Sequence, residues 1–391
     1  MSATRKNDCT ARGSVLYMAL ELSEKTWKLG FSTGLGQEPR QRDIPARAAL
    51  ILEREIQTAK ERFGLLPEAP VVSCYEAGRD GFWLHRCLLS LGVVNEVVDS
   101  SSIEVDRRQR RAKTDRLDVK KLLKMLVRYQ QGERDVWRTV RVPTVDEEDA
   151  RQLHRELETL CHEQTSHTNR IKGLLASCGE VLEVDRHLPQ RLKILRLWDG
   201  STLPADLRAR VLREFERMQM VNRQIRALER ERARRIRQGD SDPAVKQVRT
   251  LLGVKGIGIN SSWLYVREVF GWRGIKNRRQ IGAIVGLTGS PYRSGSLDHE
   301  QGISKAGNRR MRAMAVEIAW GWLRFQRQSE LSRWYERRFA YGGKRLRRIG
   351  IVALARKLLV ALWKYLETGV PPEGAELSDW RSKVHYRPDL A

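Results

Sequence analysis

The apolar and polar positions of the first third of the chain follow two periods, which predict strands and helices in alternation. Short β-branched or alternating runs predict strands, and longer runs with apolar residues three and four apart predict helices. The predicted strands are 15–22, 27–33, 71–75 and 93–98, with a poorer signal at 41–44. The predicted helices are 46–63, 81–91 and 115–129. This order predicts an α/β domain around a central sheet.

The middle of the chain is predicted to be helical. Residues 143–178 carry one apolar stripe on a polar helix, and 205–237 repeat the pattern after a break at 187–204 that contains proline and glycine. The spacing favours a coiled coil or a helical hairpin. A short Gly-Asp-Ser-Asp-Pro linker at 239–243 then leads into a mainly helical segment, 244–367, with a glycine-rich centre.

These patterns predict an α/β plus all-α fold class with three folded parts between two tails. The tail after Pro371-Pro372 is expected to be loose. The boundaries are 1–13 for a flexible tail, 14–132 for the α/β domain, 133–240 for the helical coiled-coil region, 241–370 for the C-terminal domain and 371–391 for the second tail.

The charge balance points to a polyanionic partner. The 391 residues include 73 Lys and Arg against 48 Asp and Glu, a formal charge of +25, and 41% are hydrophobic, enough for folded cores. The basic clusters are rich in arginine, which binds phosphate with two hydrogen bonds, so nucleic acid is favoured over a membrane surface. Clusters at 230–237 and 344–348 are most often solvated faces, and in so basic a chain they are also candidate phosphate contacts.

The sequence predicts a protein without a membrane span or disulfides. The five cysteines are far apart, which suits a reducing cytosol, and the polar start is no signal peptide. The apolar stretch 349–366 contains Arg356, Lys357 and Lys364, which excludes an ordinary membrane helix. We therefore expect a cytoplasmic protein that is nucleoid-associated when bound to DNA.

Four acidic residues occupy positions typical of a metal site on a sheet. Glu21 and Glu76 end two strands, and Asp115 and Asp118 lie three apart on a following helix, so they share a helix face. Carboxylate oxygens are the ligands that Mg²⁺ prefers, and such ions stabilise phosphoryl transfer. For any one of these acids alone, an ordinary surface position is the better interpretation. A loop of candidate nucleic-acid contacts precedes the helix: Arg107, Arg108, Arg110, Arg111 and Lys113.

A glycine-rich segment, 252–258 (LGVKGIG), resembles a helix-hairpin-helix element that binds DNA backbone. Gly253, Gly256 and Gly258 would let backbone N–H groups approach a phosphate, and Lys255 would add charge. A tight turn between packed helices is nearly as good an interpretation of the same pattern.

A serine on a glycine-flanked loop is the second chemical candidate. Ser294 lies in the segment 286–295, and a serine presented in this way can attack a phosphodiester as a covalent catalyst. Most loop serines have no such role, and Ser290, Ser296 and Ser304 compete with it. Basic residues around this loop are further candidates for phosphate contact: Arg293, Lys305, Arg309, Arg310 and Arg312.

With these motifs, the sequence resembles insertion-sequence transposases in which a RuvC-like DEDD domain is joined to a serine-containing domain. This is the "IS one-ten" family, also called bridge-RNA-guided recombinases. Matches occur in the right order over nearly the whole chain, from about 15 to 365. The matching stretches are 19–23, 75–78, 111–118, 252–258, 293–295 and 303–309.

The resemblance implies an RNase H-like first domain with Glu21, Glu76, Asp115 and Asp118 as Mg²⁺ ligands. It also implies Ser294 as the nucleophile of a covalent phosphoserine–DNA link, donor and target DNA as substrates, and a structured noncoding guide RNA. A homodimer or homotetramer with a site completed between subunits follows as well. One departure is that position 21 is Glu where the pattern often carries Asp, with Glu24 as a rival ligand.

Two other functions remain open from the residues. One is a RuvC-type junction nuclease that uses metal alone, and the other is a non-enzymatic nucleic-acid binder descended from a transposase. The ordered carboxylates and the resemblance favour the RNA-guided recombinase.

Overall fold

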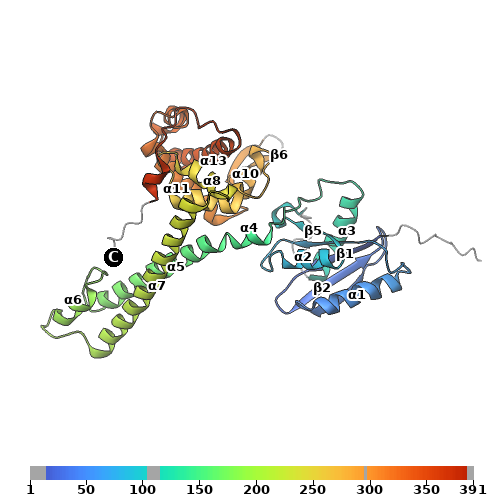
Figure 1. Cartoon of the computed structure of the whole chain (residues 1–391), viewed down its shortest axis with the longest axis horizontal. Helices are drawn as coiled ribbons and strands as arrows, with labels where there is room; N and C mark the ends of the chain where they lie inside the picture. The colour runs from blue at the N-terminus through green and yellow to red at the C-terminus, as the bar shows by residue number, and fades with distance from the viewer. Residues whose placement is uncertain (1–14, 104–114, 295–296, 385–391) are drawn as a thin grey trace, which may run out of the picture. The chain divides into compact units, whose positions relative to one another are not determined.

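The computed structural model describes residues 15–103, 115–294 and 297–384. The chain divides into two compact units, Met1–Pro143 and Thr144–Ala391 (Figure 1). Within the described ranges, none of the helices combines the length and the apolar character that crossing a membrane requires.

The first unit is built on a five-stranded mixed sheet. Its strands are β1 (Leu16–Glu21), β2 (Thr26–Ser32), β3 (Arg40–Pro45), β4 (Val71–Glu76) and β5 (Val94–Val98). They lie in the order β3-β2-β1-β4-β5. The first three pair antiparallel, whereas β4 is parallel to both β1 and β5. The strand predicted from the poor signal at 41–44 is thereby confirmed as β3.

Helices cover both faces of this sheet, as the crossovers between parallel strands require. The helices are α1 (Ala49–Arg62), α2 (Trp83–Ser90) and α3 (Asp115–Gln130), and Ser100–Ser102 forms a short 3-10 turn. Leu52 of α1 and Leu84 of α2 share one core with Leu20 of β1. Val119 and Leu122 of α3 share the other core with Ala19 of β1. The sheet is therefore the middle layer of three, and the predicted α/β order is confirmed.

The second unit begins with an arm of paired helices (Figure 1). Its helices are α4 (Val145–Asp149), α5 (Gln152–Ala176), α6 (Leu188–Ile194) and α7 (Ala205–Gln238). His167 of α5 contacts Glu214 of α7, and Gln164 contacts Asn222, so the two long helices run antiparallel. The helical-hairpin interpretation is thus confirmed.

Two details of the arm differ from the sequence prediction. The helix expected over 143–178 is interrupted between α4 and α5. The segment 187–204, expected as a break, contains α6, because Leu188 and Leu192 are buried one turn apart and Pro189 lies in the first turn, where proline is tolerated.

The remainder of the second unit packs around one large core. Its helices are α8 (Pro243–Leu252), α9 (Ile259–Tyr265) with a π-helical continuation Val266–Phe270, α10 (Arg278–Ile284), α11 (Arg309–Phe325), α12 (Glu330–Tyr335) with Glu336–Ala340, α13 (Lys344–Thr368) and the turn Trp380–Lys383. Trp263, Trp322 and Leu358 are fully buried in its core.

This part corrects two expectations. The serine segment, expected as a loop, forms the antiparallel hairpin β6 (Gly289–Ser294) and β7 (Leu297–Ile303). The segment after Pro371-Pro372 was expected to be loose, yet Ser378 donates its N–H to the Gly253 carbonyl and Leu377 bridges Val254, so this segment is held on α8.

Close packing of α3 on the sheet predicts a stability effect at Gly30. A Cβ at Gly30 would lie 2.4 Å from Cγ1 of Val119. Gly30→Ala should therefore lower the free energy of unfolding by about 1–3 kcal/mol, the usual cost of overpacking. Chemical denaturation measures this, with Gly34→Ala as control because nothing lies within 4 Å of its Cβ position. Adding Val119→Ala should recover part of the loss, and an unchanged Gly30→Ala protein would contradict the packing.

Candidate functional site

Glu21 and Glu76 lie level with each other at one edge of the sheet. The parallel register pairs Leu20 with Tyr75, so the next residues along β1 and β4 are the two glutamates. Neighbouring strands are about 4.8 Å apart, which brings two carboxylates within reach of a common ligand. Both residues are half-buried. The sequence prediction that these acids end strands is confirmed, and the pairing of those strands is what the structure adds.

The two glutamates also share a face of the sheet with α3. Side chains alternate along a strand, so Glu21 lies on the face of Ala19 and Glu76 on the face of Cys74, which both pack against α3. On α3, Asp118 is one turn before the buried Leu122, so it continues the stripe that faces the sheet. Asp115 is the first residue of the same helix.

Charged residues occupy neighbouring positions on four adjacent strands at this edge. Lys28 of β2 pairs in register with Glu21, and Asp43 of β3 pairs with Lys28, whose Nζ contacts the Asp43 carboxylate. Among the described side chains, no three of the His, Cys, Asp or Glu type gather closely enough to hold a metal ion. The side chain of Asp115 lies outside that description, as do all five residues of the arginine-rich loop, Arg107, Arg108, Arg110, Arg111 and Lys113.

The glycine segment 253–258 connects α8 to α9 and is covered by the C-terminal segment. Lys255 donates its N–H to the Glu376 carbonyl, and its Nζ lies 2.5 Å from the Glu376 carboxylate. Lys383 donates from Nζ to the carbonyls of Leu252 and Val254 at 2.7 and 2.8 Å. Burial lowers the pKa of Lys383. In this state the segment is a packed turn, which was the alternative interpretation of the pattern.

The other two glycines of that segment fit the same role. Gly256 has φ +86°, and a Cβ there would lie 3.0 Å from Phe325. Gly258 is the N-cap of α9, and its N–H donates to the Ser261 hydroxyl. Binding of DNA backbone by Gly253, Lys255, Gly256 and Gly258 stays a prediction.

Ser294 is the last residue of β6 and pairs with Leu297 next to the hairpin's tip. Arg293 precedes it and pairs with Asp298. The structure describes the backbone of the two strands, and the side chains of residues 290–301 lie outside the described part. A serine next to the tip of a two-stranded hairpin is in a position suited to contact with a large substrate.

The base of this hairpin is clamped between α10 and the loop 304–308. Ser304 donates its N–H to the Thr288 carbonyl, Lys305 to that of Gly286, and Asn308 to that of Ile284. Lys305 itself has φ +55°, a strained conformation for a residue with a side chain. The Ser-Lys-x-Gly-Asn motif thus serves to fix the hairpin that carries Ser294.

The same motif starts α11. The Asn308 side chain accepts hydrogen bonds from the N–H groups of Arg310 and Met311, capping the helix. Arg309 is exposed, Arg310 pairs with Glu158 of α5 at 2.9 Å, and Arg312 donates to the carbonyls of Val285 and Lys305. Of these predicted phosphate contacts, Arg310 and Arg312 have intramolecular partners in this state.

A buried ionic joint, which the sequence analysis missed, links the arm to the C-terminal core. Glu268 accepts two hydrogen bonds from Arg155, at 2.8 and 3.0 Å, and faces Arg151. Burial, reinforced by the nearby Arg232, lowers the pKa of His154 to about 4, so this histidine is neutral at pH 7. The spacing of Arg151, His154 and Arg155 on α5 resembles an ordinary surface and gave no signal.

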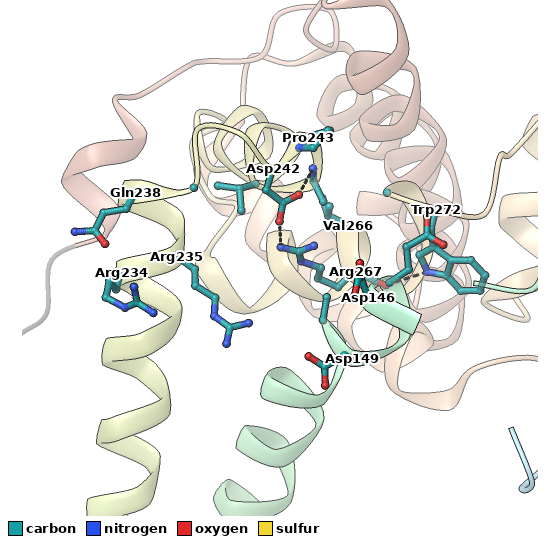
Figure 2. A pocket seen from close by; sticks show the side chains of 16 residues that line it. Asp146, Asp149, Arg234, Arg235, Gln238, Asp242, Pro243, Val266, Arg267 and Trp272 are labelled. Atoms are coloured by element: carbon teal, nitrogen blue, oxygen red, sulfur yellow. Dashed lines mark hydrogen bonds and ion pairs between the residues drawn. The ribbon is translucent and has the colours of Figure 1, made fainter. Parts of the chain in front are cut away.

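Beside this joint lies a pocket of about 620 Å³ (Figure 2). Asp146 and Asp149 of α4 line it together with Arg235 of α7, and Arg267 pairs with Asp242 across it at 2.5 Å. Its charges are mixed and partly satisfied by each other, which fits a structural junction between helices.

The comparisons with known proteins bear on this arrangement. The sequence model described as "Transposase IS116/IS110/IS902 family" matches residues 248–336, a range that includes the hairpin and its clamp. A protein of Sinorhizobium fredii named "Putative transposase y4rJ" is 41% identical over 374 residues, covering 92% of this chain and 94% of the relative. The chain belongs to the IS116/IS110/IS902 transposase family.

Two other relatives of this transposase match shorter parts. The "Probable family 20 transposase" of Pseudomonas aeruginosa is 26% identical over 59% of this chain and 66% of its own length. The "Transposase for insertion sequence element IS1328" of Yersinia enterocolitica is 25% identical over 45% of this chain and 50% of its own. The resemblance stated from the motifs is thus confirmed at the level of the family, which implies DNA transposition and DNA as a partner.

The clamp predicts that Gly307 is required by the transposase. Gly307 has φ +103°, and a Cβ there would lie 2.4 Å from the Ile284 carbonyl oxygen. Gly307→Ala should lower the free energy of unfolding by about 1–3 kcal/mol and sharply reduce transposition in cells. Gly173→Ala, in α5 with open space around it, is the control and should leave both unchanged or add slight stability. Normal melting and transposition by Gly307→Ala would contradict the role of the clamp.

Proposed function

We propose that this transposase cuts and rejoins donor and target DNA with two chemical devices, a carboxylate metal site and a nucleophilic serine, under the guidance of a structured noncoding RNA. The observation that carries the proposal is the parallel β1–β4 register, which sets Glu21 and Glu76 side by side on the face covered by α3.

The donor chemistry of that edge suits a hard divalent cation. Glu21, Glu76 and Asp118 offer only oxygen ligands, and Asp115 begins the same helix as Asp118. Two carboxylates come from adjacent strands, and the helix with the aspartates packs on their face. When bound there, Mg²⁺ would supply charge stabilisation for oxygens at a phosphodiester. The sheet order, with three antiparallel strands followed by two parallel ones, supports an RNase H-like assignment of the first unit.

The serine step is proposed as a transesterification. The Ser294 Oγ attacks a DNA phosphorus, the bond from phosphorus to one deoxyribose oxygen breaks, and the serine proton leaves while the departing oxygen gains one. The product is a phosphoserine diester that keeps the energy of the broken bond, so a second DNA hydroxyl can attack it and release the serine. The hairpin and its clamp support this role, because backbone hydrogen bonds from the loop 304–308 fix the base of the hairpin whose first strand ends at Ser294.

A guide RNA is proposed from the resemblance together with the formal charge of +25, which exceeds what folding requires. Recognition of the target by base pairing would leave the protein to hold backbones, as the arginine-rich composition suits.

A covalent-adduct assay tests the serine assignment. Purified protein, labelled donor and target DNA, Mg²⁺ and RNA transcribed from the noncoding flank of its element are combined and run on a denaturing gel. A protease-sensitive protein–DNA adduct should form, require the RNA, and vanish in Ser294→Ala. Ser290→Ala, at the other end of the same strand, is the matched control and should retain the adduct.

Two outcomes contradict the assignment. Free DNA ends that persist in Ser294→Ala and need Mg²⁺ would indicate a nuclease that uses metal alone. Loss of the adduct in Ser290→Ala, together with its persistence in Ser294→Ala, would identify Ser290 as the nucleophile in place of Ser294.

A further inference from the structure

A large groove lies between α13, α12, α10 and the base of the serine hairpin. Its volume is about 1100 Å³. Gly289, where β6 begins, and Gly302 and Ile303, where β7 ends, form part of its wall. This α13 groove is therefore continuous with the hairpin that carries Ser294, at the end of β6 about 17 Å away along an extended strand.

The charge of the α13 groove is of one sign. Eight of its lining residues are lysine or arginine and none is acidic. Arg278 and Arg279 come from α10. The others come from α13: Lys344, Arg345, Arg348, Arg356, Lys357 and Lys364. Within the part of the chain that the structure describes, no carboxylate forms an ion pair with any of these eight. Such a row of cations fits a polyanion.

The floor of the groove, by contrast, is apolar. Ile349, Val352 and Val360 of α13 line it, and Ile349 is 51% exposed. The opposite side of α13 is buried in the core through Leu354, Leu358 and neighbouring residues. Val352 and Val360 are partly buried against that same core, whereas Ile349 leaves about half of its surface exposed on the groove side.

An aromatic ring completes the floor. Trp334 of α12 lines the groove, and Nζ of Lys357 lies 4.7 Å from the centre of its ring. The cation and the neighbouring Phe339, whose ring centre is 5.4 Å away, hold the indole in place. A fixed aromatic ring between lysines and arginines is the usual arrangement for stacking a base beside its phosphate.

We infer that the α13 groove binds a single strand of DNA next to the serine hairpin, with phosphates on the α10 and α13 cations and bases on the apolar floor. The bases of a duplex are stacked inside the helix, so its phosphates would contact the lysines and arginines but its bases would not reach the apolar floor. A single strand exposes both chemistries. DNA is favoured over RNA because the groove leads to Ser294, and this step rests on the proposed function.

Binding by the full-length Ser294→Ala protein tests the inference without the chemistry. Fluorescence anisotropy would follow a labelled DNA strand of about 12 nucleotides, within the ~4–16 that single-strand sites span. Arg345→Gln with Arg348→Gln, both exposed, should weaken binding about tenfold and reduce the salt slope by about 1.4. Arg333→Gln with Arg337→Gln is the matched control, because these arginines pair with Glu330 and lie outside the groove. It should bind as the parent does.

The floor is tested by Ile349→Ser, which should weaken the single strand several-fold and leave a duplex of the same sequence unaffected. The inference is overturned if the groove variants bind the strand as tightly as the control, or if they lose duplex binding by the same factor. Tighter binding of an RNA strand of the same sequence, lost in the same variants, would overturn it too. If the groove variants lose strand binding but the unmodified protein forms no serine adduct, only the proposed chemistry is rejected. If the unmodified protein forms the adduct but the groove variants bind the strand normally, only the groove is rejected.

Discussion

The parallel pairing of β1 with β4 is the contact on which the candidate chemistry of the first unit depends. It joins two strands separated by β2, β3 and α1, and its register leaves Glu21 and Glu76 level at the sheet edge. Because side chains alternate along a strand, a slip of one residue would move one glutamate to the opposite face. Ala19 and Cys74 are buried against α3, so such a slip would also remove a residue from that core.

In the second unit, backbone hydrogen bonds position the hairpin that carries Ser294. The hairpin has mostly polar residues and little apolar area to hold it, so its position depends on the loop 304–308 and on glycines that admit a close approach. Gly286 and Gly307 both face carbonyl oxygens at distances that a Cβ would not allow. The α13 groove is lined by α10 and by the base of the hairpin, which the clamp also joins. The same elements therefore position the serine hairpin and part of the row of cations beside it.

The strands and helices of the first unit could be predicted from sequence because the apolar positions of each one repeat with the period of a strand or of a helix. The order of the strands could not, since pairing between β1 and β4 is set by contacts between distant residues. The strand-end positions of Glu21 and Glu76 were predictable, whereas their side-by-side placement was not. The hairpin β6–β7 was missed because residues such as Arg293, Asp298 and Glu300 leave no apolar alternation to detect. On α13, Arg345 and Arg348 are indistinguishable from a solvated helix face until α10 and α12 close the groove.

The most direct test of the carboxylate edge is a titration of the purified transposase with Mn²⁺, a paramagnetic substitute for Mg²⁺, followed by electron paramagnetic resonance without DNA. Glu76→Gln should lower Mn²⁺ affinity about tenfold or more, since weakening even the support of a metal ligand commonly costs ~10-fold. Glu24→Gln is the matched control, because Glu24 lies past the end of β1 and pairs with Arg79. It should bind Mn²⁺ as the unmodified protein does. Equal binding by Glu76→Gln and the unmodified protein, or an equal loss in Glu24→Gln, would contradict the account.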